Sequence, residues 1–483
     1  MINETLHVGM RIGNDERDSS DGFRFQSINP SDGTVVATLP ESTESDVDLA
    51  VSTARAALDG EWSRTGPADR QRMLLNLADL IRANRDELAR LDSLEMGMPI
   101  TRSRNSVDSA AAHLEWYAAM TRTISGRTIE NNRPTERFSY TLREPVGVVG
   151  AITPWNVPLT MMAWKLGPVI ATGSVLVHKP AEYSSLSSLR VSELCLEAGI
   201  PAGVVNVITG GRVAGAALAE HLDVDKVAFT GSVKTGQAII RASAGNIKRL
   251  TLELGGKSPN VVFADANLEA AALAAVQSIF GNSGQICTAG SRLLVERSIQ
   301  DEFVERIREI TSSLVVGDPL NQSTDMGPVA SQSQLERVLS YIHTGGEQGA
   351  TLISGGEQLT DGDLREGCFV TPTIFGNVSN EMAIAQEEIF GPVLSVTPFD
   401  TIDEAVQSAN STQYGLSGYV WTEKLRTAHE MTQRLKLGTV HVNSSNIDPA
   451  VPIGGRKMSG YGKELGSEQL EEYLETKTVW IAQ

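Results

Sequence analysis

The stretch VGVVGAITPWNVPLTMMAWKLGPVIATGSVLVHKP, residues 146–180, places two short β-rich runs on either side of a helix-like segment. Strand, helix and strand in this order and at this length predict a βαβ unit, whose two strands lie parallel in one sheet. The pattern continues with the runs GVVNVIT (203–209) and DKVAFTGS (225–232). We therefore expect a doubly wound parallel sheet in this part of the chain.

A second group of β-rich runs begins at residue 259 and predicts a second α/β domain. Two other segments, RFSYTLREP (137–145) and YLETKTVWI (473–481), alternate apolar and polar residues and lie outside both groups. Strands without a sheet of their own often pair with each other or with another subunit. The runs of the second group are PNVVFAD (259–265), SRLLVE (291–296), LSVTPF (394–399), SGYVWT (417–422) and GTVHVN (438–443).

The first third of the chain is expected to be mainly helical. The segment PADRQRMLLNLADLIRANRDELARL, residues 67–91, repeats apolar side chains at helical spacing. Pro67 suits the first turn of a helix, and Gly97 lies beyond its end. This segment carries no candidate chemical group, so we assign it to the core scaffold.

The chain has 483 residues, enough for two or three domains. A net charge of −18 at pH 7 would repel nucleic acids and anionic membranes alike, so neither is expected as a partner. The first twenty residues resemble no targeting signal and no apolar run could span a bilayer, so a cytoplasmic protein is expected. Three widely spaced cysteines indicate free thiols rather than disulfides or a zinc site, and no metal site is expected.

Candidate ligand-binding residues follow the expected parallel strands, because ligands bind beyond the carboxyl ends of such strands. Lys179 and Glu182 suit the hydroxyls of a ribose, although a solvated charge pair would look the same. GSVKTG (231–236) opens an expected helix whose first N–H groups suit a diphosphate, although such a turn is often structural. Glu253, in an apolar strand before Gly-Gly, is expected to have a raised pKa that suits a general base; a buried ion pair is the alternative.

Cys287 lies in FGNSGQICTAGSR, residues 280–292. A lone cysteine is more often a small packed thiol than a nucleophile. Gly284 and Gly290 would let the backbone approach a substrate closely, as a reactive thiol requires. Cys195 and Cys368 lack such surroundings, and we assign them structural roles. No histidine has a position that marks it as a partner of Cys287, so a Cys-His hydrolase finds little support.

These motifs together resemble those of the aldehyde dehydrogenase superfamily. LELGGKSPNVV holds Glu253, and the cysteine of GNSGQICTAGSR follows that residue by 34 positions, like the paired glutamate and cysteine signatures of the family. The likeness covers nearly the whole chain. The other segments that carry it are REPVGVVGAITPWNVPL, WKLGPVIATGSVLVHKPAE, FTGSVKTG, QEEIFGPVLSV and VPIGGRKMSGYGKELG.

The resemblance implies that Cys287 attacks an aldehyde to form a thiohemiacetal, which loses hydride to NAD and becomes a thioester. Asn156 and the Cys287 backbone N–H would stabilise the oxyanion, and Glu253 would activate the water that hydrolyses the thioester. Glu182 should repel a 2′-phosphate, so NAD is expected rather than NADP. The residues implied in NAD binding are Ile152, Pro154, Trp155, Lys179, Glu182, Gly231, Ser232, Gly236, Glu388 and Phe390.

The implied fold is α/β, with two doubly wound domains and a small β oligomerisation element, and a homodimer or homotetramer is expected. A Rossmann-like NAD-binding domain would comprise residues 1–122 and 146–253, and a catalytic domain residues 254–456. Residues 123–145 and 457–483 would form the oligomerisation element.

The residues implied to line the substrate pocket are mainly apolar, which favours an aliphatic or aromatic aldehyde. One aromatic side chain among them is too few for a cage around a quaternary ammonium, which disfavours betaine aldehyde. The absence of an arginine from the set disfavours a semialdehyde with a carboxylate. Ser283 and three members of the set, Ile286, Thr288 and Ile453, depart from the residues usual in the family, and these departures bear on substrate range rather than on activity. The set comprises Met161, Trp164, Ile286, Thr288, Ile447 and Ile453.

Three alternative functions remain to be separated from aldehyde oxidation. A coenzyme A-acylating relative would lack the glutamate that this chain has as Glu253. A catalytically silent binding protein would not need Cys287, Asn156 and Glu253 together. A cysteine hydrolase shares the acyl-enzyme that water attacks. Formation of reduced NAD from an aldehyde, without coenzyme A, separates oxidation from all three.

Overall fold

The computed structural model describes residues 5–133, 135 and 138–482. Its first large sheet comprises β2 (Met10–Ile12), β3 (Asp15–Arg17), β8 (Val148–Ile152), β9 (Val175–Lys179), β10 (Val205–Val207), β11 (Lys226–Thr230), β12 (Arg249–Glu253) and β20 (Gly460–Tyr461). The order across the sheet is β20-β12-β11-β8-β9-β10-β2-β3. The five strands β8, β9, β10, β11 and β12 run parallel to one another. The predicted doubly wound sheet is confirmed.

The direction of winding reverses between β8 and β11. From β8 the chain runs outward through β9 and β10, and then returns to β11 and β12 on the other side of β8. Every residue of β8, β9 and β11 is buried, as expected of parallel strands covered on both faces. The carboxyl ends of β8 and β11 therefore flank a topological switch point, which is where such sheets bind ligands.

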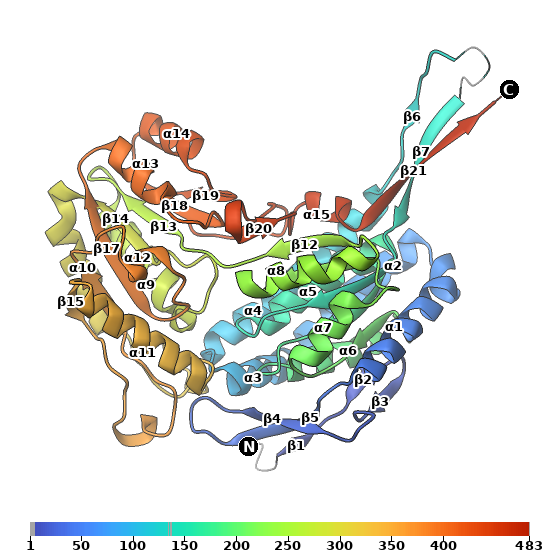
Figure 1. Cartoon of the computed structure of the whole chain (residues 1–483), viewed down its shortest axis with the longest axis horizontal. Coiled ribbons are helices and arrows are strands. Elements are labelled where there is room, and N and C mark those ends of the chain that lie inside the picture. The colour runs from blue at the N-terminus through green and yellow to red at the C-terminus, as the bar shows by residue number, and fades with distance from the viewer. Residues whose placement is uncertain (1–4, 134, 136–137, 483) are drawn as a thin grey trace.

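The helices of the first domain connect these strands or pack around them (Figure 1). The predicted helical segment 67–91 forms two helices that meet at Asn84, and Gly97 ends the second with a left-handed φ of 79°. The helices are α1 (Glu44–Asp59), α2 (Pro67–Ala83), α3 (Arg85–Met96), α4 (Ile100–Met120), α5 (Pro158–Thr172), α6 (Leu186–Glu197), α7 (Arg212–Glu220) and α8 (Val233–Ala242).

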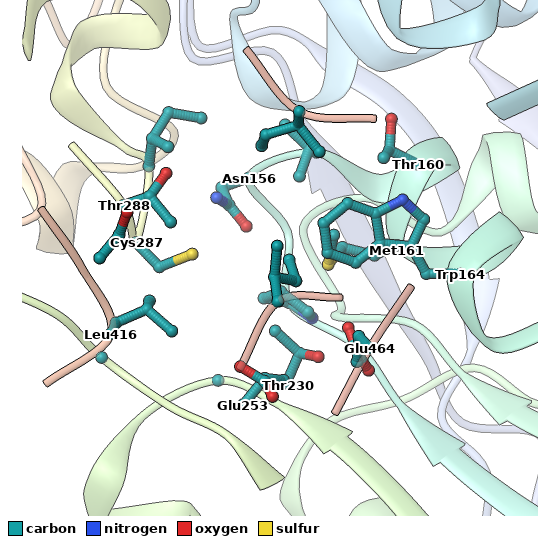
Figure 2. A pocket seen from close by; sticks show the side chains of 18 of the residues that line it. Asn156, Thr160, Met161, Trp164, Thr230, Glu253, Cys287, Thr288, Leu416 and Glu464 are labelled. Carbon is teal, nitrogen blue, oxygen red and sulfur yellow. The ribbon is translucent and has the colours of Figure 1, made fainter. Parts of the chain in front are cut away.

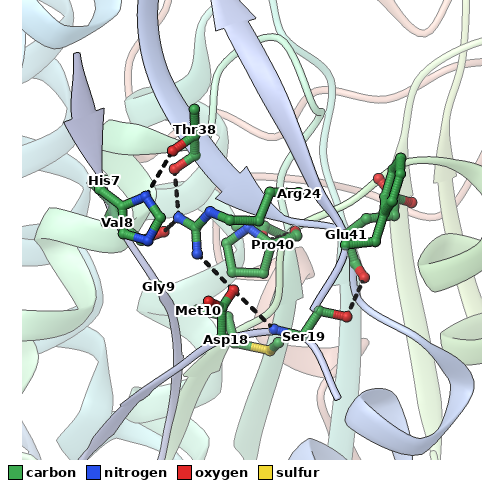
Figure 3. Close-up of polar contacts among 12 residues, drawn as sticks. His7, Val8, Gly9, Met10, Asp18, Ser19, Arg24, Thr38, Pro40 and Glu41 are labelled. Carbon is green, nitrogen blue, oxygen red and sulfur yellow. Dashed lines mark hydrogen bonds and ion pairs between the residues drawn. The ribbon is translucent and has the colours of Figure 1, made fainter. Parts of the chain in front are cut away.

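Short strands before residue 41 were missed by the prediction of a mainly helical first third. Besides β2 and β3, these are β1 (Leu6–His7), β4 (Arg24–Ile28) and β5 (Val35–Pro40), which form a separate three-stranded sheet. Figure 3 shows the side chain of Arg24 between these strands, where it donates to the carbonyl oxygens of Val8 and Thr38 at 2.6 Å each and pairs with Asp18. One long cationic side chain thus ties three short segments together.

The second α/β unit is a seven-stranded sheet, as the β-rich runs predicted. Its order is β15-β16-β17-β14-β13-β18-β19, parallel throughout except for the edge strand β15. The strands are β13 (Pro259–Val262), β14 (Arg292–Glu296), β15 (Thr351–Ser354), β16 (Thr373–Gly376), β17 (Val393–Phe399), β18 (Ser417–Trp421) and β19 (Thr439–Val442). Helix α9 (Leu268–Phe280) leads from β13 to the segment that carries Cys287.

The two alternating segments outside both groups pair with each other. β7 (Phe138–Pro145) and β21 (Leu474–Ile481) are antiparallel over their full lengths, and β6 (Thr128–Ile129) adds a third strand. Figure 1 shows this sheet projecting from the body of the molecule. Strand β20, which lies in the predicted oligomerisation segment 457–483, pairs instead with β12, because Gly460 lets the two backbones approach closely.

Among the residues that the structure describes, no helix combines the length and the apolar character needed to cross a membrane.

Candidate active site

A cavity of about 650 Å³ lies between the carboxyl ends of the first sheet and the second sheet. Asn156 follows β8, Gly231 follows β11 and Glu253 ends β12, so the first sheet supplies one side. The predicted site residues that line the cavity are Pro154, Trp155, Asn156, Met161, Trp164, Gly231, Ser232, Glu253, Ile286, Cys287, Thr288, Glu388, Phe390, Ile447 and Ile453.

Four predicted cofactor residues lie outside this lining. Lys179 is buried at the end of β9 and donates to the carbonyl oxygen of Gly210, and burial lowers its pKa while Glu182 opposes that shift. Ile152 ends β8, and Gly236 lies in α8, where a Cβ would come within 2.7 Å of the Leu254 side chain. All four belong to the same carboxyl edge of the sheet, beside the switch point.

The loop before Cys287 has an unusual backbone. Asn282 and Ser283 have φ values of 54° and 55°, in the left-handed region that carries strain for residues other than glycine. The Asn282 side chain donates to the main-chain oxygen of Asn156 at 2.9 Å, and the Ser283 hydroxyl donates to that of Gly327 at 2.8 Å. These bonds to distant segments hold the loop in place and fix the position of Cys287.

Gly284 has a packing role that the sequence did not indicate. Its φ is 72°, and a Cβ there would lie 2.1 Å from the carbonyl oxygen of Gly391. The glycine is therefore required by contact between two backbones rather than by approach of a substrate. Gly256 is constrained similarly, since its Cβ would lie 2.3 Å from the carbonyl oxygen of Cys287.

The Cys287 thiol is half-buried and points into the cavity (Figure 2). Burial raises its pKa to about 12, the charges of Glu388 and Glu253 add to the shift, and the backbone N–H groups of Cys287 and Thr288 oppose it. The thiol is therefore protonated at neutral pH and needs a base before it can act as a nucleophile. Burial also raises the pKa values of Cys195 and Cys368, neither of which lines the cavity.

The Asn156 amide faces the same space as the Cys287 sulfur (Figure 2). It is 4% exposed, and its Nδ2 donates to the main-chain oxygen of Gln285 at 2.7 Å. A side-chain amide has two N–H groups. One of them thus anchors the cysteine loop, and the second is free to donate to an oxygen bound beside the sulfur.

The Glu253 carboxyl lies on another side of this space, beside Thr230 (Figure 2). Burial raises its pKa to about 8, while Lys165, Lys463 and the backbone N–H of Gly455 lower it. Its Oε1 has no hydrogen-bond partner among the described residues. The expected raised pKa is therefore present, and the carboxyl can gain or lose a proton near neutral pH.

A buried ion pair next to Glu253 was not predicted from the sequence. Lys165, on α5, contacts Glu464 and donates to the Thr230 hydroxyl at 2.8 Å. Both charged side chains are almost completely buried, and burial lowers the pKa of Lys165 to about 7. A lone lysine in the apolar helix PLTMMAWKLGPVIAT was the available signal, but nothing in the sequence pointed to Glu464 as its partner.

On the other side of the cavity, Glu388 rests on the Gly255–Gly256 backbone. Its Oε1 accepts a hydrogen bond from the Gly256 N–H at 2.9 Å, and a Cβ on Gly255 would collide with the carboxylate. Trp155 and Phe390 meet edge to face with their ring centroids 5.3 Å apart. Two glycines and two rings thus shape the part of the cavity that the resemblance assigns to nicotinamide and its ribose.

One face of α4 forms a polar wall of the cavity, which corrects the expectation of a lining without an arginine. This wall was not foreseen because α4 is far from Cys287 in sequence and reaches the cavity only by packing against α5. The wall comprises Arg102, Asn105, Ser106, Ser109 and His113.

The fold and this cavity define the class of the protein: an α/β enzyme scaffold with a doubly wound nucleotide-binding sheet. The family model described as "Aldehyde dehydrogenase family" matches residues 17–479. The chain therefore belongs to the aldehyde dehydrogenase family, and the predicted fold class is confirmed.

Similar proteins carry the same family name. An aldehyde dehydrogenase of Aspergillus niger is 46% identical over 475 residues, which are 98% of this chain and 94% of the relative. The NAD-dependent aldehyde dehydrogenase of Sinorhizobium meliloti has a TM-score of 0.97 at 42% identity, and the match covers 100% of this chain and 96% of the Sinorhizobium meliloti chain. The NAD⁺ complex of a Bacillus cereus aldehyde dehydrogenase has a TM-score of 0.96 at 43% identity, and the match covers 100% of this chain and 97% of the Bacillus cereus chain.

Proposed function

We propose that the protein oxidises an aldehyde to a carboxylic acid with NAD and water, through a thioester on Cys287. One observation carries the proposal: the Cys287 sulfur, the Asn156 amide and the Glu253 carboxyl surround one space in a single cavity. A nucleophile, a hydrogen-bond donor and a base are the groups that such a reaction requires. The solved NAD-dependent relative, with nearly the same fold, supports the choice of cofactor.

In the first step, the Cys287 thiol gives up its proton to water, the resulting thiolate attacks the aldehyde carbon, and the carbonyl oxygen becomes an oxyanion. The free N–H of Asn156 and the backbone N–H of Cys287 donate to this oxygen. Preorganised donors of this kind stabilise a transition state by about 3 to 4 kcal/mol. The bond from Asn156 to the Gln285 carbonyl keeps the donor next to the sulfur throughout.

Bound NAD would supply the hydride acceptor, and loss of hydride from the former aldehyde carbon would leave a thioester on Cys287. The Glu253 carboxylate then takes a proton from water, the resulting hydroxide attacks the thioester carbon, and the carboxylic acid leaves with release of the Cys287 thiolate. The unpaired Oε1 of Glu253 is available to accept that proton. Coenzyme A is not needed in this sequence.

The residues at the switch point fit NAD. Ser232 caps the N-terminus of α8, and its hydroxyl accepts a hydrogen bond from the Thr235 N–H. The earlier N–H groups of the helix are left for a diphosphate. Lys179 and Glu182 would hold the adenosine ribose, and the Glu182 carboxylate would repel the extra phosphate of NADP. The remaining residues proposed to contact the cofactor are Ile152, Pro154, Trp155, Gly231, Gly236, Glu388 and Phe390.

Growth of absorbance at the reduced-nicotinamide band tests the proposed reaction. The purified protein, NAD and a panel of aldehydes are mixed without coenzyme A, and a parallel series contains NADP. We expect NADH and a carboxylic acid in equal amounts, with faster turnover for NAD than for NADP. No NADH with any aldehyde of a broad panel would contradict the proposal.

The rate of steady turnover should rise with pH through about pH 8. Glu253 acts as a base only when ionised, and its pKa is raised to about 8, so protonation removes activity below that value. Above it the carboxylate persists and the rate reaches a plateau. Measurement of kcat from about pH 6 to 10 checks the direction; a rate that falls as pH rises through 8 would contradict the assignment.

We propose that the chain assembles as a homodimer or homotetramer through the sheet of β6, β7 and β21. This sheet projects from the body and exposes apolar side chains, including Phe138 at 42% and Trp480 at 56%. Light scattering should give a mass of at least twice the 51.8 kDa of the chain, and Trp480→Glu should lower it. A single-chain mass for the unmodified protein would exclude this assembly.

We also propose a cytoplasmic location, with no nucleic-acid or membrane partner. The negative charge and the three free cysteines support it.

A further inference from the structure

Arg102 places a positive charge in the wall of the cavity. It lies in the first turn of α4, and the polar residues that follow it on the same face extend the wall along the helix. Met161, Ile286 and Ile453, which are apolar, also line the cavity. The lining of the cavity therefore combines a cation with hydrocarbon side chains.

No acidic group in the described part of the chain neutralises Arg102. Among the described residues, its guanidinium has no ion pair and no hydrogen bond, and burial lowers its pKa without opposition from any carboxylate. Arg337, the other arginine of the cavity, differs because it donates to the carbonyl oxygens of Glu388 and Ile389. Arg104, two residues further along α4, pairs with Asp86 at 2.8 Å and does not line the cavity.

The segment that carries Cys287 leaves room for this guanidinium. Gly281 directly follows α9, and a Cβ there would lie 2.3 Å from Nη1 of Arg102. The φ and ψ of Gly281 are −58° and 135°, which any residue can adopt. Gly281 is thus required because a side chain there would occupy the space of Arg102, and its own backbone conformation does not require glycine. Arg102 lies at the beginning of the loop that ends at the nucleophile.

A half-buried cation without a partner is unfavourable in a folded protein, because it loses hydration and gains no compensating charge. A negatively charged ligand would supply that charge. Arginine is suited to a carboxylate, which it binds through two parallel N–H···O bonds. Arg102 lies in the same cavity as Cys287 and beside the loop that carries Cys287. The carboxylate that Arg102 binds would therefore belong to the aldehyde itself.

We propose that the substrates are aldehydes with a carboxylate at the far end of a short hydrocarbon chain, and that Arg102 binds this carboxylate. This inference rests on the proposed function, since it assumes that Cys287 attacks the aldehyde end. The apolar side chains of Met161, Ile286 and Ile453, which line the same cavity, would then contact the hydrocarbon chain between the two ends. This proposal replaces the expectation of an aliphatic or aromatic aldehyde, which rested on the six residues that the resemblance implied to line the pocket.

Paired substrates test the inference. An ω-oxo acid and the n-alkanal of equal carbon number are compared over a series of chain lengths, and kcat/KM is measured for each by NADH formation. For the unmodified enzyme we expect the oxo acid to be preferred at one or two lengths. Arg102→Gln should lower the ratio of oxo-acid to alkanal kcat/KM about 10- to 100-fold, the effect of losing charge-assisted hydrogen bonds.

Arg104→Gln is the matched control, because it makes the same chemical change on the same helix outside the cavity. It should leave the ratio unaltered. Gly281→Ala is a second variant that displaces the guanidinium without removing it, and it should lower the ratio in the same direction. This variant decides the question if Arg102→Gln does not fold.

Three outcomes would overturn the inference while leaving the proposed function intact. These are an unmodified enzyme that prefers alkanals at every chain length, an unaltered ratio in both Arg102→Gln and Gly281→Ala, and equal loss on both substrate types. Absence of NADH with every aldehyde would instead contradict the proposed function itself. The two failures are therefore distinguishable in one set of assays.

Discussion

Replacement of Cys287 by serine should lower kcat/KM for aldehyde oxidation by about 10⁴-fold or more. A serine hydroxyl is a far weaker nucleophile than a thiolate at neutral pH, and an oxygen ester would replace the thioester. The geometry of the loop should persist, because its anchors are Asn282 and Ser283 rather than the sulfur. Initial rates of NADH formation measure the loss.

Cys368→Ser is the control for this substitution. Cys368 is buried outside the cavity, and its sulfur lies 4.0 Å from the polar Oε1 of Gln332, so a hydroxyl is accommodated there. Its activity should stay within about twofold of the unmodified enzyme. Retention of substantial activity by Cys287→Ser, or equal loss in both variants, would remove Cys287 from the proposed role.

Glu253→Gln should lower steady turnover about 10²- to 10⁴-fold, the usual contribution of a general base. Glutamine keeps the size of the side chain but cannot take a proton from water. Because Glu253 is proposed to act on water after hydride transfer, the first turnover should still produce NADH. Rapid-mixing absorbance should therefore show a burst of about one NADH per active site, followed by very slow turnover.

An added strong nucleophile separates this explanation from simple misfolding. Hydroxylamine can attack the thioester without help from a base, so it should accelerate the slow phase of Glu253→Gln. Loss of the burst together with steady turnover would place Glu253 in an earlier step.

Local patterns in the sequence were sufficient to predict the central sheets and the candidate residues that follow their strands. The runs around β8, β9 and β11 are short and rich in β-branched and other apolar residues, so they indicate buried parallel strands directly. Once those strands are parallel, Asn156, Gly231 and Glu253 must come to one edge. The resemblance added Cys287, which no periodicity marks.

Contacts between distant segments could not be predicted in this way. Lys165 and Glu464 lie far apart in sequence, and Glu464 alone resembles a surface charge. Arg102 and the polar residues after it have the spacing of a solvated helix face, which is what the sequence of α4 suggests. Only the packing of α4 against α5 turns that face into a cavity wall. The short N-terminal strands depend on Arg24 and similarly give little local signal.

The covalent state of Cys287 during turnover tests the central claim most directly. Glu253→Gln is mixed with NAD and an aldehyde, quenched in acid and analysed by intact mass and by mapping of the peptide that contains Cys287. The mechanism predicts a mass increase equal to one acyl group less one hydrogen, located on Cys287 and formed together with NADH. Formation of NADH with Cys287 unmodified, or with the acyl group on another residue, would contradict it.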